Sequence, residues 1–441
     1  MSCGKPEKHK FSILTFGCRC NQADSAAIRE GLCCRSMFET VNRSDADLIV
    51  VNTCTVTQRT DQQVRQAIRR LHRENPSARL IVTGCYAERD PDVLAGMPGV
   101  SLVVGNVDKE RLPEILELQA TDSQGEIIRS PFDEGRDYLL PPMSQTGGKT
   151  RPLVKLQDGC DAHCSYCIVP SVRGPGRSAR VENVLAEVRS LVDSGFQEIV
   201  LTGVHLGAFG LRLKNHPRLT DLLGEIVKIP QLGRIRLSSI EPMHFDRAIV
   251  KLAVENLVFA RHFHIPLQSG SDRILRLMRR PYTAARFRDL LRYIQSELPD
   301  AGLGTDILVG FPGETDDDFA ETCALIEDLP LSYLHVFPFS PREGTVAYSL
   351  PERIPSQVMK NRLSRVLEIA RLKNLSFRRQ FKGRILPAIT LSHEEDLGSS
   401  IVLTDNYIHA RVPGLSVPPN RLIEIRIEDV RPEATYASIV D

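Results

Sequence analysis

Six of the eleven cysteines in this 441-residue chain fall into two sets whose spacing suits iron–sulfur ligation. The compact set is a C-x3-C-x2-C run made of Cys160, Cys164 and Cys167. The dispersed set is made of Cys18, Cys54 and Cys85, each of which follows a short apolar run. Three thiolates leave one iron of a four-iron cluster without a protein ligand, so that iron can bind a substrate or a cofactor. The cysteines therefore predict two clusters with a catalytic role.

Other interpretations of these cysteines stay open at the level of sequence. Zinc also takes thiolate ligands, but a zinc ribbon usually needs a second C-x2-C pair, which the sequence lacks. The dispersed cysteines could be structural, since free cysteine is among the most buried residue types. Cys20 lies two residues from Cys18 and is a possible competing ligand. We interpret the remaining cysteines as non-ligands: Cys3, Cys33, Cys34 and Cys323.

The dispersed cysteines each lie at the end of a predicted strand. The runs 11–16, 47–51 and 80–83 are apolar and partly β-branched, which is typical of buried parallel strands. Helix-compatible patterns lie between them, and this alternation predicts a small doubly wound α/β domain over residues 8–120. Ligands bind beyond the carboxyl ends of the strands in such sheets, so the three cysteines should converge.

The compact cysteines follow another strand-like run, 153–156, and strands and helices keep alternating downstream. Six βα-type units over residues 151–345 match a partial (β/α)6 barrel, whose site lies at the carboxyl ends of the strands. Each polar residue or glycine at these ends has a possible explanation as part of a loop or turn. Their recurrence at one face of the sheet favours a cofactor pocket.

Three further segments complete the predicted organisation. Residues 121–150 are rich in glycine, proline, serine and charge, which suits a linker. Residues 355–382 form a predicted helix with eight basic residues and one acidic residue, and this imbalance favours contact with a phosphate backbone over an ordinary solvated face. Short strand-like runs over 383–441 predict a small antiparallel β-barrel.

The overall composition is that of a globular protein, with 42% hydrophobic and 25% charged residues and a net charge of +1. The sequence has no run of about 18 apolar residues and no apolar segment at its N-terminus, so we expect neither a membrane span nor a signal peptide. We therefore expect a cytoplasmic protein, in which many cysteines favour metal or redox roles over disulfides.

The motifs resemble those of a known family. The run from Cys160 to Cys167, with Tyr166 before its last cysteine, resembles the signature of the radical S-adenosylmethionine (radical SAM) superfamily. The segments 17–22, 52–57 and 84–87 resemble the three cysteine motifs of the methylthiotransferase family, and 264–272 and 306–315 are similar to further blocks of that family. Residues 404–408 resemble part of the TRAM RNA-binding domain. The motifs around Cys54 and Cys85 are most similar to the branch that acts on threonylcarbamoyl-adenosine in tRNA.

The resemblance implies the chemistry. It implies two 4Fe–4S clusters and two molecules of S-adenosylmethionine, which together place a methylthio group on carbon 2 of the modified adenine beside the anticodon. The cluster of the compact cysteines would cleave the cofactor to a radical, and the cluster of the dispersed cysteines would hold the sulfur. The expected cofactor-binding residues are Tyr166, Gly203, Ser239, Glu241, Gln268 and Gly310. Arg279 or Arg280 is expected to bind the carboxylate of the threonylcarbamoyl group.

The implied partners are a tRNA anticodon stem-loop, an electron donor such as flavodoxin or ferredoxin, and a sulfur donor, and we expect a monomer. Two departures from the family pattern stand out. Cys20 replaces an aliphatic residue, and Thr202-Gly203-Val204 lacks the acidic residue that binds the cofactor amine in many radical SAM barrels. Methylthiolation of isopentenyladenosine, or of a ribosomal-protein aspartate, remains an alternative, as does a non-catalytic iron–sulfur RNA-binding protein.

Overall fold

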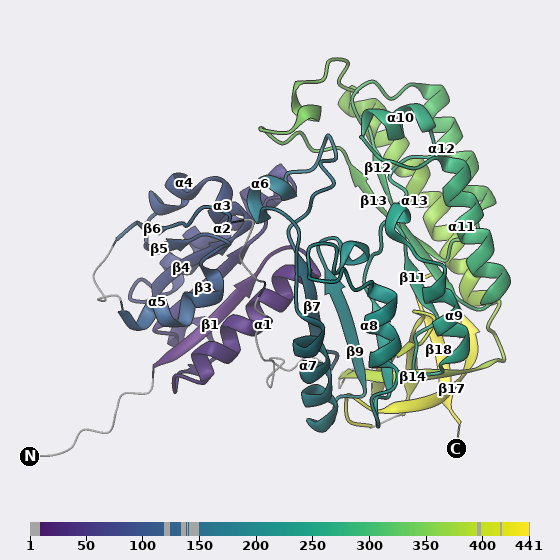
Figure 1. Ribbon diagram of the computed structural model, residues 1–441, viewed down its shortest axis with the longest axis horizontal. Helices are drawn as coiled ribbons and strands as arrows, with labels where there is room; N and C mark the ends of the chain where they lie inside the picture. Colours follow the sequence, from purple (N-terminus) through teal and green to yellow (C-terminus); the bar gives the residue numbers. More distant parts are fainter. Residues whose placement is uncertain are drawn as a thin grey trace, which may run out of the picture.

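The computed structural model describes residues 9–118, 124–133, 138, 140, 150–394, 398–414 and 417–440. Three folded parts follow one another along the chain, from an N-terminal sheet domain through a central domain to a C-terminal barrel (Figure 1). Most of the predicted linker 121–150 lies outside the described residues. Its described part contains strand β6 (Glu126–Ile128), which extends the N-terminal sheet instead of leaving it.

The N-terminal domain is a parallel sheet covered by helices, as the sequence predicts. Its strand order is β2-β1-β3-β4-β5-β6. The strands other than β6 are β1 (Lys10–Thr15), β2 (Phe38–Glu39), β3 (Leu48–Thr53), β4 (Arg79–Gly84) and β5 (Val100–Val104). The helices are α1 (Arg19–Cys33), α2 (Gln58–Glu74), α3 (Cys85–Arg89), α4 (Pro91–Ala95) and α5 (Leu112–Leu118). Every residue of β3 is buried, which explains its nearly continuous apolar sequence.

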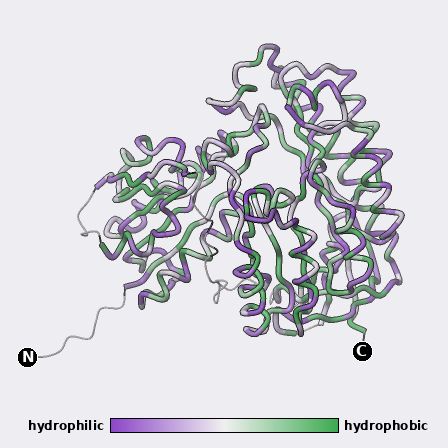
Figure 2. Tube along the Cα trace, viewed as in Figure 1, coloured by the Kyte–Doolittle hydropathy of each residue, from purple (hydrophilic) through white to green (hydrophobic). Residues whose placement is uncertain are grey.

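The central domain is the predicted partial (β/α)6 barrel. Its parallel strands are β7 (Leu153–Asp158), β9 (Glu198–Gly203), β10 (Arg234–Leu237), β11 (His262–His264), β12 (Gly302–Val309) and β13 (Tyr333–Pro338). Isolated bridges between 235 and 259 and between 239 and 264 join the two halves of this sheet. A short antiparallel strand, β8 (Arg177–Ser178), pairs with β7. The strands are largely hydrophobic and the outer helix faces hydrophilic, so the core lies between them (Figure 2).

Helices of the central domain follow its strands. They are α6 (Val169–Arg173), α7 (Val181–Asp193), α8 (Leu219–Ile226), α9 (Ala248–Glu255), α10 (Asp272–Leu277), α11 (Ala284–Glu297) and α12 (Asp316–Asp328). The short helix α6 is exceptional, because it packs against α3 of the N-terminal domain (Figure 1). The polypeptide just beyond the compact cysteines therefore meets the domain that carries the dispersed cysteines.

The C-terminal part is a closed five-stranded barrel in the order β14-β15-β16-β18-β17. Its strands are β14 (Ile385–Glu394), β15 (Ser399–Thr404), β16 (His409–Pro413), β17 (Leu422–Val430) and β18 (Thr435–Ile439). Four of the pairings are antiparallel, as predicted, but β16 and β18 pair in parallel. The sequence did not predict β18, whose parallel pairing closes the barrel into a mixed one.

Helix α13 (Ser356–Arg379) joins the central domain to the barrel, and its basic residues have mostly internal roles. Six of the eight basic side chains in the predicted 355–382 segment contact groups of this chain: Arg362, Arg365, Arg371, Lys373, Arg378 and Lys382. Contact of this segment with a phosphate backbone stays a prediction, which these contacts do not test. Arg371 pairs with Glu368 of the same helix, and the other five attach the segment to neighbouring parts of the chain.

Among the described residues, we find no helix with the length and apolar character needed to cross a lipid bilayer.

Candidate active site

The fold brings the three dispersed cysteines to one place. Cys18 precedes α1, Cys54 follows β3, and Cys85 begins α3 directly after β4. The side-chain Oδ1 of Asn21 lies 4.0 Å from the Sγ atoms of both Cys18 and Cys85. All three cysteines line one cavity of about 340 Å³. The arrangement is that of a three-thiol site, with space beside the sulfur atoms.

Two glycines keep that space open. Gly17 has φ of +101°, and a Cβ at this position would lie 2.8 Å from the Sγ of Cys54. Gly84 has φ of +97°, and a Cβ there would lie 2.4 Å from the carbonyl oxygen of Thr53. Both backbone conformations favour glycine. The two turns therefore hold the cysteine loops closer together than a larger residue permits, which fits the assembly of a cluster.

The protein environment distinguishes the thiols. A hydrogen bond with Cys20, aided by the positive charge of Arg173, lowers the pKa of Cys18 to about 5, whereas burial raises the pKa of Cys54 to about 12. Cys20 is itself buried in α1 and lines the same cavity, so it remains a neighbour able to compete with Cys18.

A buried arginine from the central domain completes the three-thiol site. The Nε of Arg173, at the end of α6, lies 3.3 Å from the Sγ of Cys85. Its two other nitrogens bind Asp158 at 2.7 Å and Asp24 at 3.0 Å. Asp24 also pairs with two buried lysines, Lys109 and Lys155. A guanidinium at this position offsets the negative charge that bound thiolates carry. This role was not predicted from the sequence, because Arg173 reaches Cys85 and Asp24 across a domain boundary.

The compact cysteines occupy the loop after β7 and also have donors beside them. The Sγ of Cys160 lies 3.4 Å from the Nδ1 of His205, and the Sγ of Cys164 accepts a hydrogen bond of 3.2 Å from Arg280. Burial raises the pKa of Cys160, and raises that of Cys167 to about 12. Hydrogen bonds to cluster sulfurs are an established means by which proteins tune such clusters, so the donor set fits an iron–sulfur group.

His205 was not singled out from the sequence, although it directly follows Thr202-Gly203-Val204. The Nε2 of His205 lies 2.9 Å from the Nδ1 of the exposed His244. Burial lowers the pKa of His205 to about 4, so the ring is neutral near pH 7. If the neutral ring of His205 carries its proton on Nδ1, it donates to the Sγ of Cys160, and its Nε2 accepts a hydrogen bond from the Nδ1 of His244. The segment that lacks the family's acidic residue thus supplies an imidazole beside the compact cysteines.

Of the expected cofactor-binding residues, Gly203 and Ser239 line the cavity of the dispersed cysteines. Tyr166 packs edge-on against Phe311, with ring centroids 6.5 Å apart. The positions of Gly203 and Ser239 place the ends of β9 and β10 across the cavity from the three-thiol site.

The other expected cofactor-binding residues have specific local partners. Glu241 accepts a hydrogen bond from Arg280. Gln268 adopts φ of +71° and bonds through its backbone to β12. Gly310 lies against α13, where a Cβ would lie 2.8 Å from the Sδ of Met359. None of these three residues lines the cavity of the dispersed cysteines, and Gly310 faces a helix.

Neither Arg279 nor Arg280 lines the cavity of the dispersed cysteines. Arg280 is buried, and its guanidinium binds Glu241, Cys164 and the hydroxyl of Tyr282. Arg279 is exposed and lines a different cavity, of about 510 Å³, which also includes His205 and His244. The structure therefore gives Arg280 a place beside the compact cysteines, where its hydrogen-bonding groups are already engaged.

The wall opposite the three-thiol site carries imidazole groups. The Oδ1 of Asp306 lies 2.9 Å from the Nε2 of His264 and 3.2 Å from the Nδ1 of His335. The Nδ1 of His264 lies 2.9 Å from the hydroxyl oxygen of Tyr333. Burial opposes ionisation of Asp306, but the two imidazoles outweigh it and keep its pKa well below its usual range. These hydrogen bonds are sufficient to explain why His264, Asp306 and His335 lie together.

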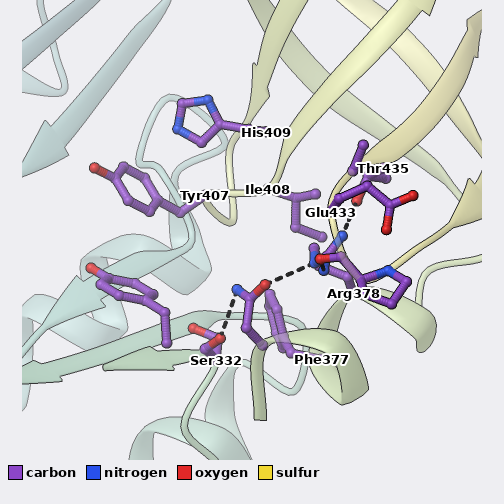
Figure 3. A pocket seen from close by; sticks show the side chains of 12 residues that line it. Ser332, Phe377, Arg378, Tyr407, Ile408, His409, Glu433 and Thr435 are labelled. Atoms are coloured by element: carbon purple, nitrogen blue, oxygen red, sulfur yellow. Dashed lines mark hydrogen bonds between the residues drawn. The ribbon is translucent and has the colours of Figure 1, made fainter. Parts of the chain in front are cut away.

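A separate cavity of about 220 Å³ lies between α13, β13 and the barrel (Figure 3). Arg378 donates to the Oδ1 of Asn374 at 2.8 Å and to the Oγ1 of Thr435 at 3.0 Å across this cavity (Figure 3). Tyr407 also lines it, and the hydroxyl of Tyr407 accepts a hydrogen bond of 2.9 Å from Arg19. The hydrogen bonds of Arg378 and Tyr407 attach the barrel to the rest of the molecule.

Comparison with known proteins identifies the family of this chain. Residues 154–326 match the model of the radical SAM superfamily, and residues 10–105 match that of the uncharacterized protein family UPF0004. The chain is 38% identical to the threonylcarbamoyladenosine tRNA methylthiotransferase MtaB of Aquifex aeolicus, over 92% of this chain and 97% of that protein. It is 30% identical to the tRNA-2-methylthio-N(6)-dimethylallyladenosine synthase of Natranaerobius thermophilus, over 95% and 94% of the two chains.

A solved structure shares the fold. The radical S-adenosylmethionine methyltransferase TsrM of Kitasatospora setae superposes with a TM-score of 0.56 at 17% identity, over 77% of each chain. The compact cysteines at the head of the barrel, the sheet domain before it and the full-length similarity all lead to one conclusion. This chain belongs to the radical SAM methylthiotransferase family, and it uses a 4Fe–4S cluster and S-adenosylmethionine.

Proposed function

We propose that this enzyme transfers a methylthio group to carbon 2 of threonylcarbamoyladenosine next to the anticodon of tRNA. The names of its relatives support the substrate, since the Aquifex aeolicus protein at 38% identity acts on threonylcarbamoyladenosine and the synthase at 30% identity acts on dimethylallyladenosine. We further propose that Cys18, Cys54 and Cys85 hold a second 4Fe–4S cluster, whereas Cys160, Cys164 and Cys167 hold the first.

One observation supports this proposal above all others. The cavity of about 340 Å³ has the three dispersed cysteines on one side and the ends of β9 and β10, including Gly203 and Ser239, on the other. Parallel αβ barrels bind their substrates and cofactors at these strand ends. A base in this cavity would lie between the sulfur-carrying site and the cofactor.

When bound, the clusters and S-adenosylmethionine supply the radical, the sulfur and the methyl group. The residues of the chain supply positions and charge. Arg173 balances the thiolates of the three-thiol site, and Arg280 donates to Cys164 while Glu241 fixes its direction.

Anaerobic reconstitution of the full chain tests the enzyme class. With dithionite and S-adenosylmethionine, the reconstituted protein should form 5′-deoxyadenosine. Absence of this product from a protein with a full complement of iron would instead favour a non-catalytic iron–sulfur RNA-binding protein.

Nucleoside mass spectrometry of tRNA from a deletion strain tests the substrate. We expect 2-methylthio-threonylcarbamoyladenosine to disappear and its unmethylthiolated precursor to accumulate. Loss of the methylthio form of isopentenyladenosine would identify the alternative tRNA substrate, and unchanged tRNA would direct attention to a ribosomal-protein aspartate.

We also propose an anticodon stem-loop, a reductant such as flavodoxin or ferredoxin, and a sulfur donor as partners. Sequence-specific proteins bind RNA mostly at unpaired bases, which an anticodon loop offers. Activity of the reconstituted enzyme on an isolated modified stem-loop would show that the loop alone suffices as a substrate.

A further inference from the structure

The charged side chains that line the active-site cavity differ in how far they are already paired. Arg173 is fully engaged by Asp24, Asp158 and Cys85. Asp306 is the one carboxylate among the described cavity-lining residues, and two imidazoles share it. The remaining charged side chain among the described cavity-lining residues is Arg19.

Arg19 is a half-buried cation that lines the cavity directly after Cys18. Within the described part of the chain, its one hydrogen bond goes to the hydroxyl of Tyr407, and it forms no ion pair with a carboxylate. Most arginines near the site, such as Arg173 and Arg280, bind carboxylates. An arginine inside a cavity without an anionic partner is suited to bind an anionic group of a ligand.

The geometry of the cavity suits a ligand of that kind. Arg19 extends from the three-thiol site toward Tyr407, so its guanidinium lies away from the sulfur atoms. In N6-threonylcarbamoyladenosine, carbon 2 and carbon 6, which carries the N6 substituent, are both bonded to N1, so their exocyclic bonds point in different directions within the plane of the ring. A base with carbon 2 toward the cysteines therefore directs its substituent to a part of the cavity wall beside them, where Arg19 lies. The only acid on the described cavity wall, Asp306, is held by His264 and His335.

We propose that Arg19 binds the carboxylate of the threonylcarbamoyl group and so selects this substrate over adenosines with neutral N6 substituents. The inference rests on the proposed function. It assigns to Arg19 the role that the sequence suggested for Arg279 or Arg280. Arg280 has its guanidinium engaged beside Cys164, and Arg279 lies in another cavity.

The test uses the reconstituted full chain and two synthetic anticodon stem-loops. One carries threonylcarbamoyladenosine, and the other carries the same nucleoside with its carboxylate replaced by a carboxamide. The wild type should bind the carboxylate RNA at least about tenfold more tightly, because a charge-assisted hydrogen bond contributes that much or more. Arg19→Gln should lose this preference while its affinity for the carboxamide RNA stays unchanged, and Arg19→Lys should retain part of the preference.

Three controls make the result specific. Iron and sulfide content and the absorption spectrum of Arg19→Gln must match those of the wild type, since Cys18 is adjacent. Arg69→Gln, at an exposed arginine on α2, should leave the preference intact. Arg279→Gln should also leave it intact.

Retention of the preference by Arg19→Gln would overturn the inference, as would its loss in Arg279→Gln instead. A wild type that binds both RNAs equally would also overturn it. The proposed function is judged separately, because the nucleoside analysis of the deletion strain decides the substrate whatever Arg19 does. If the deletion strain loses 2-methylthio-threonylcarbamoyladenosine but Arg19→Gln keeps the preference for the carboxylate RNA, this inference is refuted and the proposed function is retained.

Discussion

The guanidinium Nε of Arg173 lies 3.3 Å from the Sγ of Cys85, although the two residues belong to different domains. Arg173 ends the short helix α6, which begins two residues after Cys167. The same guanidinium binds Asp158, two residues before Cys160. One buried side chain therefore contacts the surroundings of both cysteine sets. The dispersed cysteines gain this arginine only when the central domain packs against the N-terminal domain.

Replacement of Arg173 should damage both stability and the second cluster. Arg173→Gln leaves Asp24 and Asp158 buried with less positive charge, which we expect to lower the free energy of unfolding by about 3 kcal/mol or more. Urea unfolding of the apoprotein measures this loss, and iron analysis after reconstitution measures the cluster. Arg173→Lys keeps the positive charge, so its losses of stability and of iron should both be smaller. Wild-type stability and iron content in Arg173→Gln would show that the contact has no such role.

The two cysteine sets should be separable by function. Alanine in place of Cys18, Cys54 and Cys85 should remove about four of about eight irons, since each set is expected to hold one four-iron cluster. This variant should still cleave S-adenosylmethionine but should not form the methylthio product.

Alanine in place of Cys160, Cys164 and Cys167 should remove a similar amount of iron and abolish the cleavage. Equal loss of cleavage in both triple variants would contradict the division of roles. Cys20→Ala is the matched control, and full iron content in this variant would settle the competition between Cys18 and Cys20 in favour of Cys18.

Gly17→Ala should prevent assembly of the second cluster without unfolding the domain. The added Cβ would lie 2.8 Å from the Sγ of Cys54, and the φ of +101° is unfavourable for alanine. We expect iron loss confined to the second cluster, with formation of 5′-deoxyadenosine retained. Gly195→Ala is a matched control, because Gly195 also has a positive φ but has no atoms within contact distance of an added Cβ. Normal iron content in Gly17→Ala would show that the loop can widen to accept a side chain.

Arg280 should raise the reduction potential of the first cluster. It donates to the Sγ of Cys164, and loss of a charged hydrogen bond of about 1.4 kcal/mol corresponds to about 60 mV for a one-electron couple. Arg280→Gln should therefore lower the midpoint potential measured by a redox titration followed by electron paramagnetic resonance. The exposed neighbour Arg279 serves for comparison, and Arg279→Gln should change the potential much less. Similar potentials in Arg280→Gln and the wild type would exclude this tuning.

Acid should weaken the attachment of the barrel through Glu198. Burial disfavours the charged form of Glu198, but Arg236, Arg234 and Arg151 outweigh this and lower its pKa from 4.5 to about 2. Arg236 also donates to the backbone carbonyls of Thr404 and Asp405 in the barrel. Because the pKa is lower in the folded state than in the unfolded state, the stabilisation is complete above about pH 4.5. It is lost as the pH falls toward 2.

A comparison of the wild type with Glu198→Gln measures this contribution. We expect the variant to be less stable by about 3 kcal/mol at pH 7. The difference should shrink as the pH falls from about 4.5 to 2, as judged by urea unfolding. A difference that does not change over this range would show that ionisation of Glu198 does not support the fold.

The regular parts of the fold were predictable because their signals are local. The apolar runs before Cys18, Cys54 and Cys85 identified three parallel strands, and their carboxyl ends necessarily share one edge of the sheet. Strand β18 was missed because its five residues have only a short alternating pattern, and its parallel pairing with β16 depends on barrel closure.

The side chains around the cysteines were much harder to predict. Arg173, His205 and Arg19 are ordinary polar residues in the sequence, and their roles come from contacts with distant segments. The basic helix shows a second limit of sequence patterns. Its net charge suggested an RNA surface, but charge composition does not reveal that acids from α12 and the barrel lie beside it.

The hydrogen bond between Arg19 and Tyr407 joins residues 388 positions apart in the sequence. During synthesis the N-terminal domain emerges from the ribosome long before the barrel that carries Tyr407. The guanidinium of Arg19 therefore gains this partner only after nearly the whole polypeptide has been made. A nascent chain that stops short of the barrel lacks this hydrogen bond, so the position of Arg19 at the cavity is set last.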